Sequence, residues 1–178
     1  MLLASFLGGT QIEKYLSQLM DGYLRAAGEK DPQRQEQIWL ALNQTEQQLC
    51  TQFDRFVDDF AQVPAERARV STLPLALPYF DRMVPAATFD MRAALQLHAK
   101  AIRAACGHEG MGAEQRKDQA YMMTAELMLM QHTCHWFCKS RTVASVRLMA
   151  RHKTAYEQVL QTVAVQTRNA YKKLLKIK

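Results

Sequence analysis

Cysteine, proline and glycine are scarce in this sequence of 178 residues, which has four Cys, five Pro and seven Gly. Four cysteines are too few for the disulfide scaffold of a small secreted protein, so we expect free thiols and a cytoplasmic setting. No apolar run approaches the 18 residues of a transmembrane helix. The apolar start at residues 1–9 is too short for a signal-peptide core, and no basic segment precedes it.

The length suits one domain, residues 1–178, and a chain of this size buries roughly 68–70% of its unfolded surface. A hydrophobic content of 48% excludes a disordered chain. The fold therefore needs neither a disulfide nor a metal.

Apolar residues recur at the spacing of one helix face along most of the chain. No segment shows the strict alternation that predicts a half-buried strand. We therefore expect an all-α single-domain bundle of about five helices, at residues 11–27, 32–62, 89–106, 113–139 and 142–176.

Local start and stop signals support the first three helices. Thr10 is an expected N-cap, and Gly28 is an expected C-terminal glycine. Asp31 and Pro32 match an N-cap followed by proline in the first helical position. Thr88 is the expected N-cap of the third helix.

Residues 63–88 contain four of the five prolines and are also apolar. Each proline disfavours helix at the residue before it, so a sustained helix is excluded here. An apolar irregular segment is expected to pack on the body. We interpret it as a structured Pro-rich crossover between helices two and three.

Residues 113–178 contain neither Gly nor Pro. One helix of that length would extend about 99 Å, so a restart at Ser140 or Thr142 is the preferred interpretation, with an unbroken helix as the alternative. Heptad spacing favours a bundle helix in the second part, along Val146, Met149, Lys153, Tyr156, Leu160, Val163, Thr167, Ala170 and Leu174.

The charge is strongly asymmetric along the chain. Residues 1–138 carry 13 Lys/Arg and 16 Asp/Glu, whereas residues 139–178 carry 10 Lys/Arg and one acid, Glu157. A long basic C-terminal helix on a mildly acidic body indicates an anionic partner, which could be nucleic acid, an anionic membrane surface or an acidic protein. A solvated basic helix without a partner is the alternative.

The first functional hypothesis is a non-enzymatic protein that binds the DNA or RNA phosphate backbone. No sequence-reading motif accompanies the charge, so base-specific recognition is not expected. Lysines at the C-terminal end of a helix also complement the helix dipole. A purely structural role of these lysines is therefore the alternative to nucleic-acid binding. The candidate nucleic-acid-binding residues are Arg147, Arg151, Arg168, Lys172, Lys173 and Lys176.

The second hypothesis is a protein-interaction module, such as an adaptor, a secretion-associated factor or an assembly subunit, with a protein partner or a second copy. Apolar residues fill consecutive positions 127–130, which favours a helix buried on several sides or one that also meets a partner. The candidate interface residues are Met122, Met128, Met130, Tyr156, Leu160 and Val163.

Histidine and cysteine gather at residues 132–138. Imidazole and thiolate are ligands that zinc prefers, but one helix face cannot present all four side chains, and no second ligand pair follows. His132, His135 and Cys138 are therefore weak metal candidates, and no metal or cofactor is expected.

Other enzymatic motifs are incomplete. Cys–His catalysis would need an oxyanion loop, the surroundings of His98 do not fit a phosphotransfer histidine, and the Gly107–Gly112 turn lacks a phosphate-loop ending. The sequence therefore predicts no catalytic residue.

Overall fold

The computed structural model describes residues 2–73, 87–108 and 110–176, which are mostly helical. The expected all-α class is confirmed. Nine helices and two short strands occur in the described ranges, rather than about five helices. The difference arises because the C-terminal part is divided and short helices flank the long ones. No helix in these ranges is long and apolar enough to cross a membrane.

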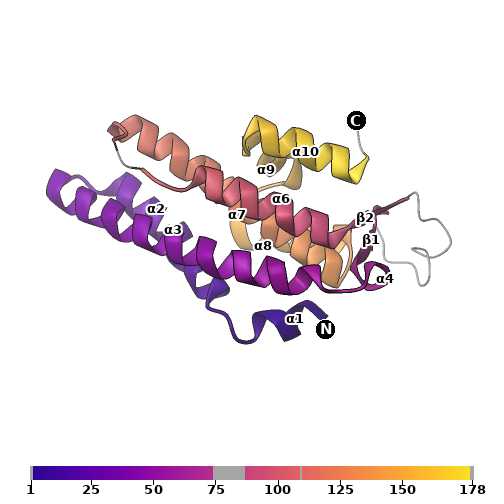
Figure 1. Cartoon of the computed structure of the whole chain (residues 1–178). Coiled ribbons are helices and arrows are strands. Elements are labelled where there is room, and N and C mark those ends of the chain that lie inside the picture. The colour runs from indigo at the N-terminus through magenta and orange to yellow at the C-terminus, as the bar shows by residue number, and fades with distance from the viewer. Residues whose placement is uncertain (1, 74–86, 109, 177–178) are drawn as a thin grey trace.

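The first third of the chain is a helical hairpin that follows a short N-terminal helix, α1 (Leu2–Leu7). Helices α2 (Ile12–Gly28) and α3 (Pro32–Ala61) lie side by side (Figure 1). The Asp31 carboxylate accepts hydrogen bonds from the amides of residues 33 and 34, with Pro32 first in the helix, as predicted. The prediction for Thr10 was wrong, because its hydroxyl donates to the Leu7 carbonyl and Gln11 takes the N-cap position.

The crossover contains a strand pair that the sequence did not indicate. Helix α4 (Ala65–Ala68) leads into β1 (Arg69–Ser71), which pairs antiparallel with β2 (Thr88–Asp90). Strands of three residues are too short to show alternation. Thr88 lies in β2, and the Asp90 carboxylate caps the next helix instead. The remaining prolines of the crossover, at positions 74, 78 and 85, lie outside the described residues.

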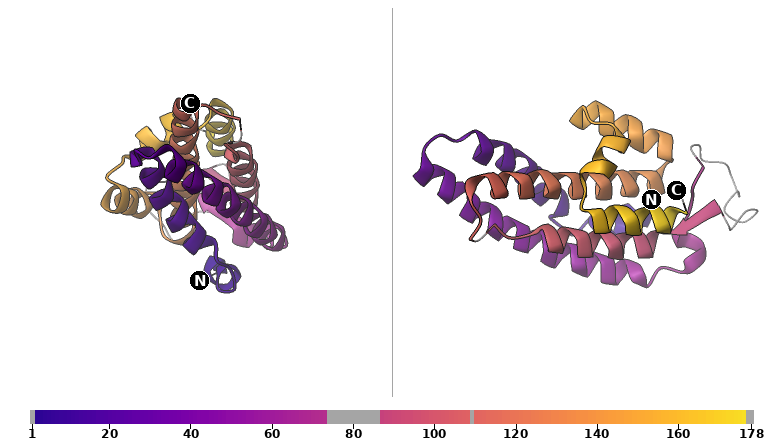
Figure 2. Two further views of the ribbon diagram at one scale, coloured as in Figure 1. Left: turned by 90° about the vertical axis from the view of Figure 1, so that its left-hand side faces the viewer. Right: turned by 90° about the horizontal axis from the view of Figure 1, so that it is seen from above.

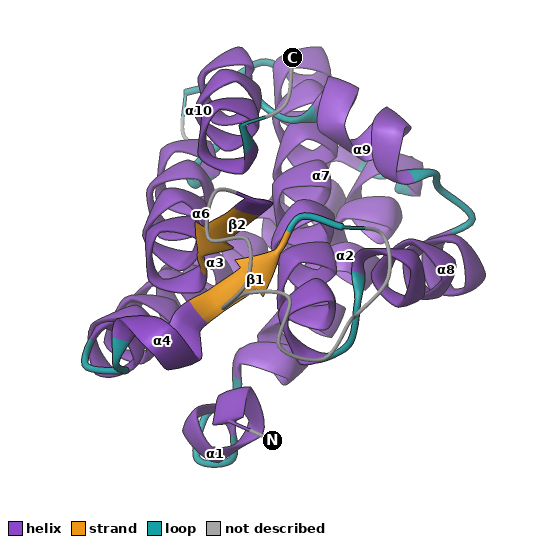
Figure 3. Cartoon of the chain, turned by 90° about the vertical axis from the view of Figure 1, so that its right-hand side faces the viewer, coloured by secondary structure: helices purple, strands orange, loops and turns teal. Residues whose placement is uncertain are grey.

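Helix α7 (Ala113–Cys138) lies among the other helices. It packs against α2 and against α6 (Met91–Ala105), and the end-on view in Figure 3 places it between α6 and α8 (Arg141–His152). Leu127, Leu129 and Met130 are each at most 3% exposed. The prediction that this helix is buried on several sides is confirmed.

The basic C-terminal segment is three helices and not one. They are α8 (Arg141–His152), α9 (Tyr156–Thr162) and α10 (Val165–Leu175). Ser140 caps α8, as one of the two expected restart sites. The unbroken helix 113–178 is excluded. Neither later break contains Gly or Pro, and both let the chain fold back onto the body.

The predicted heptad seam is divided by these breaks. Val146 and Met149 are 63% and 45% exposed, because α8 buries Ala144 and Leu148 instead. Four later seam positions face the core and are each at most 6% exposed, namely Tyr156, Leu160, Val163 and Thr167. Lys153 and Ala170 are exposed. A continuous seam would require one straight helix, which the fold does not form.

Candidate anion-binding site

The six predicted basic residues fall on two separate surfaces. Arg147 and Arg151 belong to α8, which packs against α7. The other four belong to α10 and its C-terminal cap, and α10 packs against α6. Seen from above, α8 and α10 lie on opposite sides of α7 (Figure 2, right). The structure therefore does not place all six residues in one row.

The Arg168 side chain of α10 forms hydrogen bonds within the protein. Its guanidinium donates to the backbone carbonyl of Gln161 at 3.0 Å and to the side-chain oxygen of the same residue at 2.9 Å. These bonds join the end of α9 to α10 across the break. Arg168 thus has a structural role beside any role in binding.

Arg147 and Arg151 of α8 border a hollow of about 380 Å³ between α7 and α8. Four residues separate them, so they lie one turn apart on the same side of the helix. We call this site the α7–α8 hollow. It is lined by Gln131, His132, His135, Arg147, Leu148, Ala150, Arg151 and His152.

Positive charge dominates this hollow. Within the described part of the chain, neither Arg147 nor Arg151 forms a salt bridge. Burial lowers the pKa of His135, and the charges of both arginines lower it further, although Glu13 opposes them. Burial, with Arg151, also lowers the pKa of His152. A bound anion would relieve this repulsion, which is the arrangement expected of an anion site.

An unsatisfied histidine nitrogen supports the same interpretation. The Nε2 atom of His152 is buried and has no hydrogen-bond partner within the described ranges. Buried polar atoms are usually paired, so a small movement of the His152 ring toward the hollow would let this nitrogen bind an anion there. A phosphate oxygen would accept a hydrogen bond from Nε2 when that nitrogen carries a proton.

His132 forms the inner wall of the hollow. Its Nε2 lies 3.0 Å from the Ser145 hydroxyl, and its ring stacks on Tyr156 with a centroid distance of 4.4 Å. Burial, with smaller effects from Arg141 and His135, lowers the pKa of His132 to about 3. His132 is therefore neutral near pH 7. It forms part of the wall of the hollow and adds no charge to it.

The weak metal candidates do not meet at one point. His132 and His135 both line the α7–α8 hollow, and His132 contacts Ser145 of α8. Cys138 instead lines a different groove, which α7 forms with residues of α1, α2 and α3 and which His135 also borders. Among residues 2–73, 87–108 and 110–176, no group of three or more His, Cys, Asp or Glu side chains could hold a metal ion.

Most of the predicted partner-interface residues are buried in the chain's own core. Met130, Tyr156, Leu160 and Val163 are each at most 6% exposed, while Met122 and Met128 are half-buried. The large apolar side chains of α8 that are exposed are Val143, Val146 and Met149.

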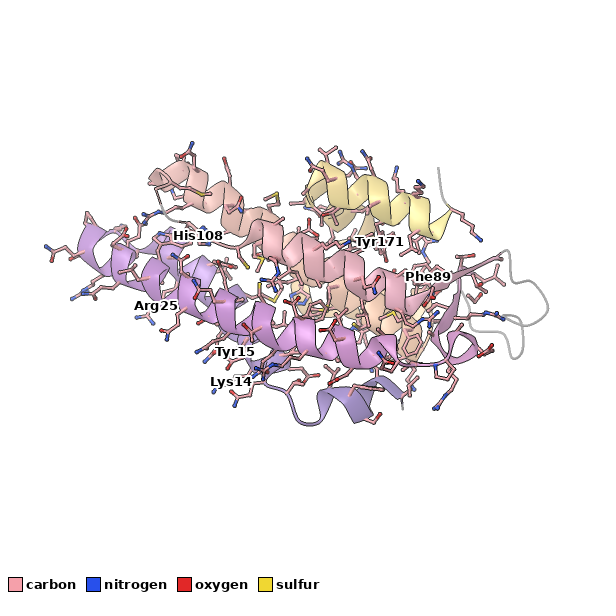
Figure 4. The ribbon with its side chains drawn as sticks, viewed as in Figure 1. Lys14, Tyr15, Arg25, Phe89, His108 and Tyr171 are labelled. Carbon is pink, nitrogen blue, oxygen red and sulfur yellow. The ribbon has the colours of Figure 1, made fainter. Side chains whose placement is uncertain are left out.

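Sequence reasoning missed a buried polar network centred on Glu46. This carboxylate accepts hydrogen bonds from the Tyr23 hydroxyl at 2.5 Å, the His108 Nε2 at 2.6 Å and the Gly107 amide at 2.8 Å. We call these four residues the Glu46 network. Figure 4 labels His108 where the α6–α7 connection approaches the α2–α3 hairpin.

One sequence signal could have revealed this network. Glu46 lies on the buried stripe of α3 with Trp39, Leu42 and Leu49, at spacings of three and four residues. A carboxylate in such a stripe must find partners, because an unpaired buried charge is very costly. The partners themselves lie more than sixty residues further along the chain or on α2, so the stripe does not identify them.

Comparison of the chain with protein-family models, with curated proteins and with solved structures finds no match. The geometry of the chain alone therefore supports a functional proposal.

Proposed function

We propose that this chain is a non-enzymatic nucleic-acid-associated protein that holds the phosphate backbone at the α7–α8 hollow. The observation that carries the proposal is the convergence of Arg147, Arg151, His135 and His152 on one hollow. Arginine recognises phosphate through its planar fork of donors, and two unpaired arginines one turn apart offer two such contacts.

The lysines of α10 have a different role in this proposal. Lys172 and Lys173 lie on the opposite side of α7 from the hollow, so they attract a polyanion at longer range. Exposed charges of this kind raise the association rate and are screened by salt. The hollow holds the phosphate, and α10 adds attraction that depends on ionic strength.

The proposal predicts a characteristic pH dependence. The pKa values of His135 and His152 are lowered in the free protein by burial and by neighbouring cations, and only Glu13 opposes this at His135. A bound phosphate favours the protonated imidazoles and raises both pKa values. Binding therefore takes up protons, and affinity should increase as the pH falls from 8 to 6.

The test is fluorescence anisotropy with labelled single- and double-stranded DNA and RNA across a salt series. In duplex DNA each phosphate contact contributes about 0.9 to the slope of log K against log salt. R147Q/R151Q should weaken binding and make that slope shallower by up to about 1.8, without affecting the fold. R34Q/R55Q removes two exposed arginines from α3 and is the matched control.

Two results would overturn the assignment. Equal affinities and slopes for R147Q/R151Q and R34Q/R55Q would show that the hollow does not hold phosphate. A loss of binding confined to K172Q/K173Q would transfer the site to α10. Because Arg151 is in the last turn of α8, where it also complements the helix dipole, the stability of each variant is measured in parallel.

A protein-interaction role is the second candidate, and the exposed residues of α8 favour it. Val143, Val146 and Met149 are 39%, 63% and 45% exposed on a helix that also carries Arg147 and Arg151. Such a surface fits the groove of an acidic partner. V146S/M149S removes the apolar contacts without adding charge beside Arg147 and Arg151. It should then weaken partner binding while leaving nucleic-acid binding unchanged, as measured by sedimentation with the isolated partner.

A further inference from the structure

Two cysteines that are far apart in sequence lie against each other in the fold. Cys50 is in α3, and Cys106 is the C-terminal cap residue of α6. Their Sγ atoms are 3.0 Å apart. A disulfide bond is about 2.05 Å long, so a shift of roughly 1 Å would join them. The packing of α3 against α6 therefore preorganises a dithiol.

Small solutes have a route to this pair. Cys106 lines a hollow of about 390 Å³ together with Asn43, Glu46, Gln47 and Gly107. Cys50 is 6% exposed and lies in contact with the Cys106 sulfur. A molecule of the size of hydrogen peroxide can therefore enter beside the Cys106 sulfur, and the Cys50 sulfur lies 3.0 Å from it.

The surroundings favour a thiolate on one of the two sulfurs. The Cys106 thiol donates a hydrogen bond that lowers the pKa of Cys50, and the nearby Arg103 guanidinium lowers it further, against burial and Glu46. The same hydrogen bond, together with burial, raises the pKa of Cys106. When one sulfur of the pair is ionised, the charge is therefore favoured on Cys50 and the proton on Cys106, and a thiolate beside a thiol is what stepwise oxidation uses.

We propose that Cys50 and Cys106 form a redox-active dithiol, which hydrogen peroxide oxidises to an intramolecular disulfide and a small thiol reduces. The Cys50 thiolate attacks one peroxide oxygen and the O–O bond breaks. The released hydroxide takes a proton to become water. The resulting sulfenic acid is attacked by the second sulfur, which loses its proton. The S–S bond forms as the sulfenic hydroxyl leaves as a second water.

The other two cysteines provide an internal control. Cys134 and Cys138 both lie on α7, and the Cys134 thiol donates to the Met130 sulfur at 3.8 Å. Burial raises the pKa of Cys134 to about 12 and also raises that of Cys138. These thiols are therefore expected to react more slowly with peroxide than the dithiol pair.

The test treats the folded full chain with stoichiometric hydrogen peroxide and measures its intact mass and non-reduced peptide map. The wild type and C134S/C138S should each lose two hydrogen masses and give a peptide that links residues 50 and 106, and dithiothreitol should reverse both changes. C50S and C106S should form no such link. Circular dichroism verifies that each variant is folded.

The wild-type peptide map is decisive even if a single-cysteine variant fails to fold. A native protein that forms no 50–106 link under these conditions would overturn the proposal. So would a link that appears only in urea, or one that joins Cys134 or Cys138 at the same rate.

Discussion

Replacement of Glu46 by alanine should strongly destabilise this protein, because it removes the acceptor that the three donors of the Glu46 network share. Glu46 is 0% exposed, and it accepts from the Tyr23 hydroxyl, the His108 ring and the Gly107 amide. In the variant these donors would lose their shared charged acceptor and lie beside a new cavity. Water that enters from the hollow beside Gly107 would replace that acceptor only in part, because it carries no charge.

The magnitude follows from this geometry. A hydrogen bond to a charged group contributes about 1.5–3 kcal/mol, and loss of one member of a buried pair costs about 3–5 kcal/mol. Since neighbouring bonds are not additive, we expect E46A to lose about 3–5 kcal/mol in the free energy of unfolding. Y23F removes one donor and leaves the other two bonds, so it should lose about 1.5–3 kcal/mol.

Urea unfolding followed by far-ultraviolet circular dichroism measures these losses, with linear extrapolation to water. The matched control is E36A, which removes an exposed carboxylate of the same helix that pairs with Arg116 at the surface. Exposed pairs contribute up to about 1 kcal/mol. If E46A and E36A were destabilised equally, the network would contribute nothing beyond a surface pair, and the reasoning would be refuted.

Two further predictions concern pH and the start of α8. Burial lowers the pKa values of His98 and His132 to about 3, so the unfolded chain binds more protons below its own histidine pKa of about 6.5. Unfolding free energy should therefore decrease as the pH falls from about 6.5 toward 3, and H98Q should flatten this dependence by up to about 1.4 kcal/mol per pH unit in urea titrations. An unchanged slope in H98Q would contradict the buried neutral state of His98. Arg141 lies 5.5 Å from the Trp136 ring centroid and 5.3 Å from that of Tyr156, so R141Q should lose about 1–2 kcal/mol in thermal unfolding, whereas a gain in stability would contradict a cation–π role.

Much of the helical framework follows from local sequence. The thirty residues of α3 begin at Pro32 behind the Asp31 cap and contain no further Gly or Pro, so their bounds could be predicted. The end of α7 and the restart at Ser140 were also predictable, because a serine N-cap acts within three residues. Intrahelical hydrogen bonds join residues four apart, so local patterns contain the information for them.

The breaks after α8 and α9 could not be predicted in the same way. Lys153 ends α8 with a left-handed backbone, φ 53°, a conformation that favours glycine. At the second break, the amide of Ala164 donates to the Glu126 carboxylate of α7, which is 0% exposed. That acceptor lies 38 residues earlier in the chain, and burial raises its pKa despite this bond.

The candidate site shows the same division between sequence and tertiary structure. From the order of the residues it follows that positive charge gathers after residue 138, that Arg147 and Arg151 share a helix face, and that most of the chain is helical. The packing of the helices separates these arginines from α10, places His135 and His152 beside them, and brings Cys50 to Cys106. The physical reason is range: helix formation depends on neighbours within one turn, whereas burial and electrostatic contact depend on which distant segments pack together.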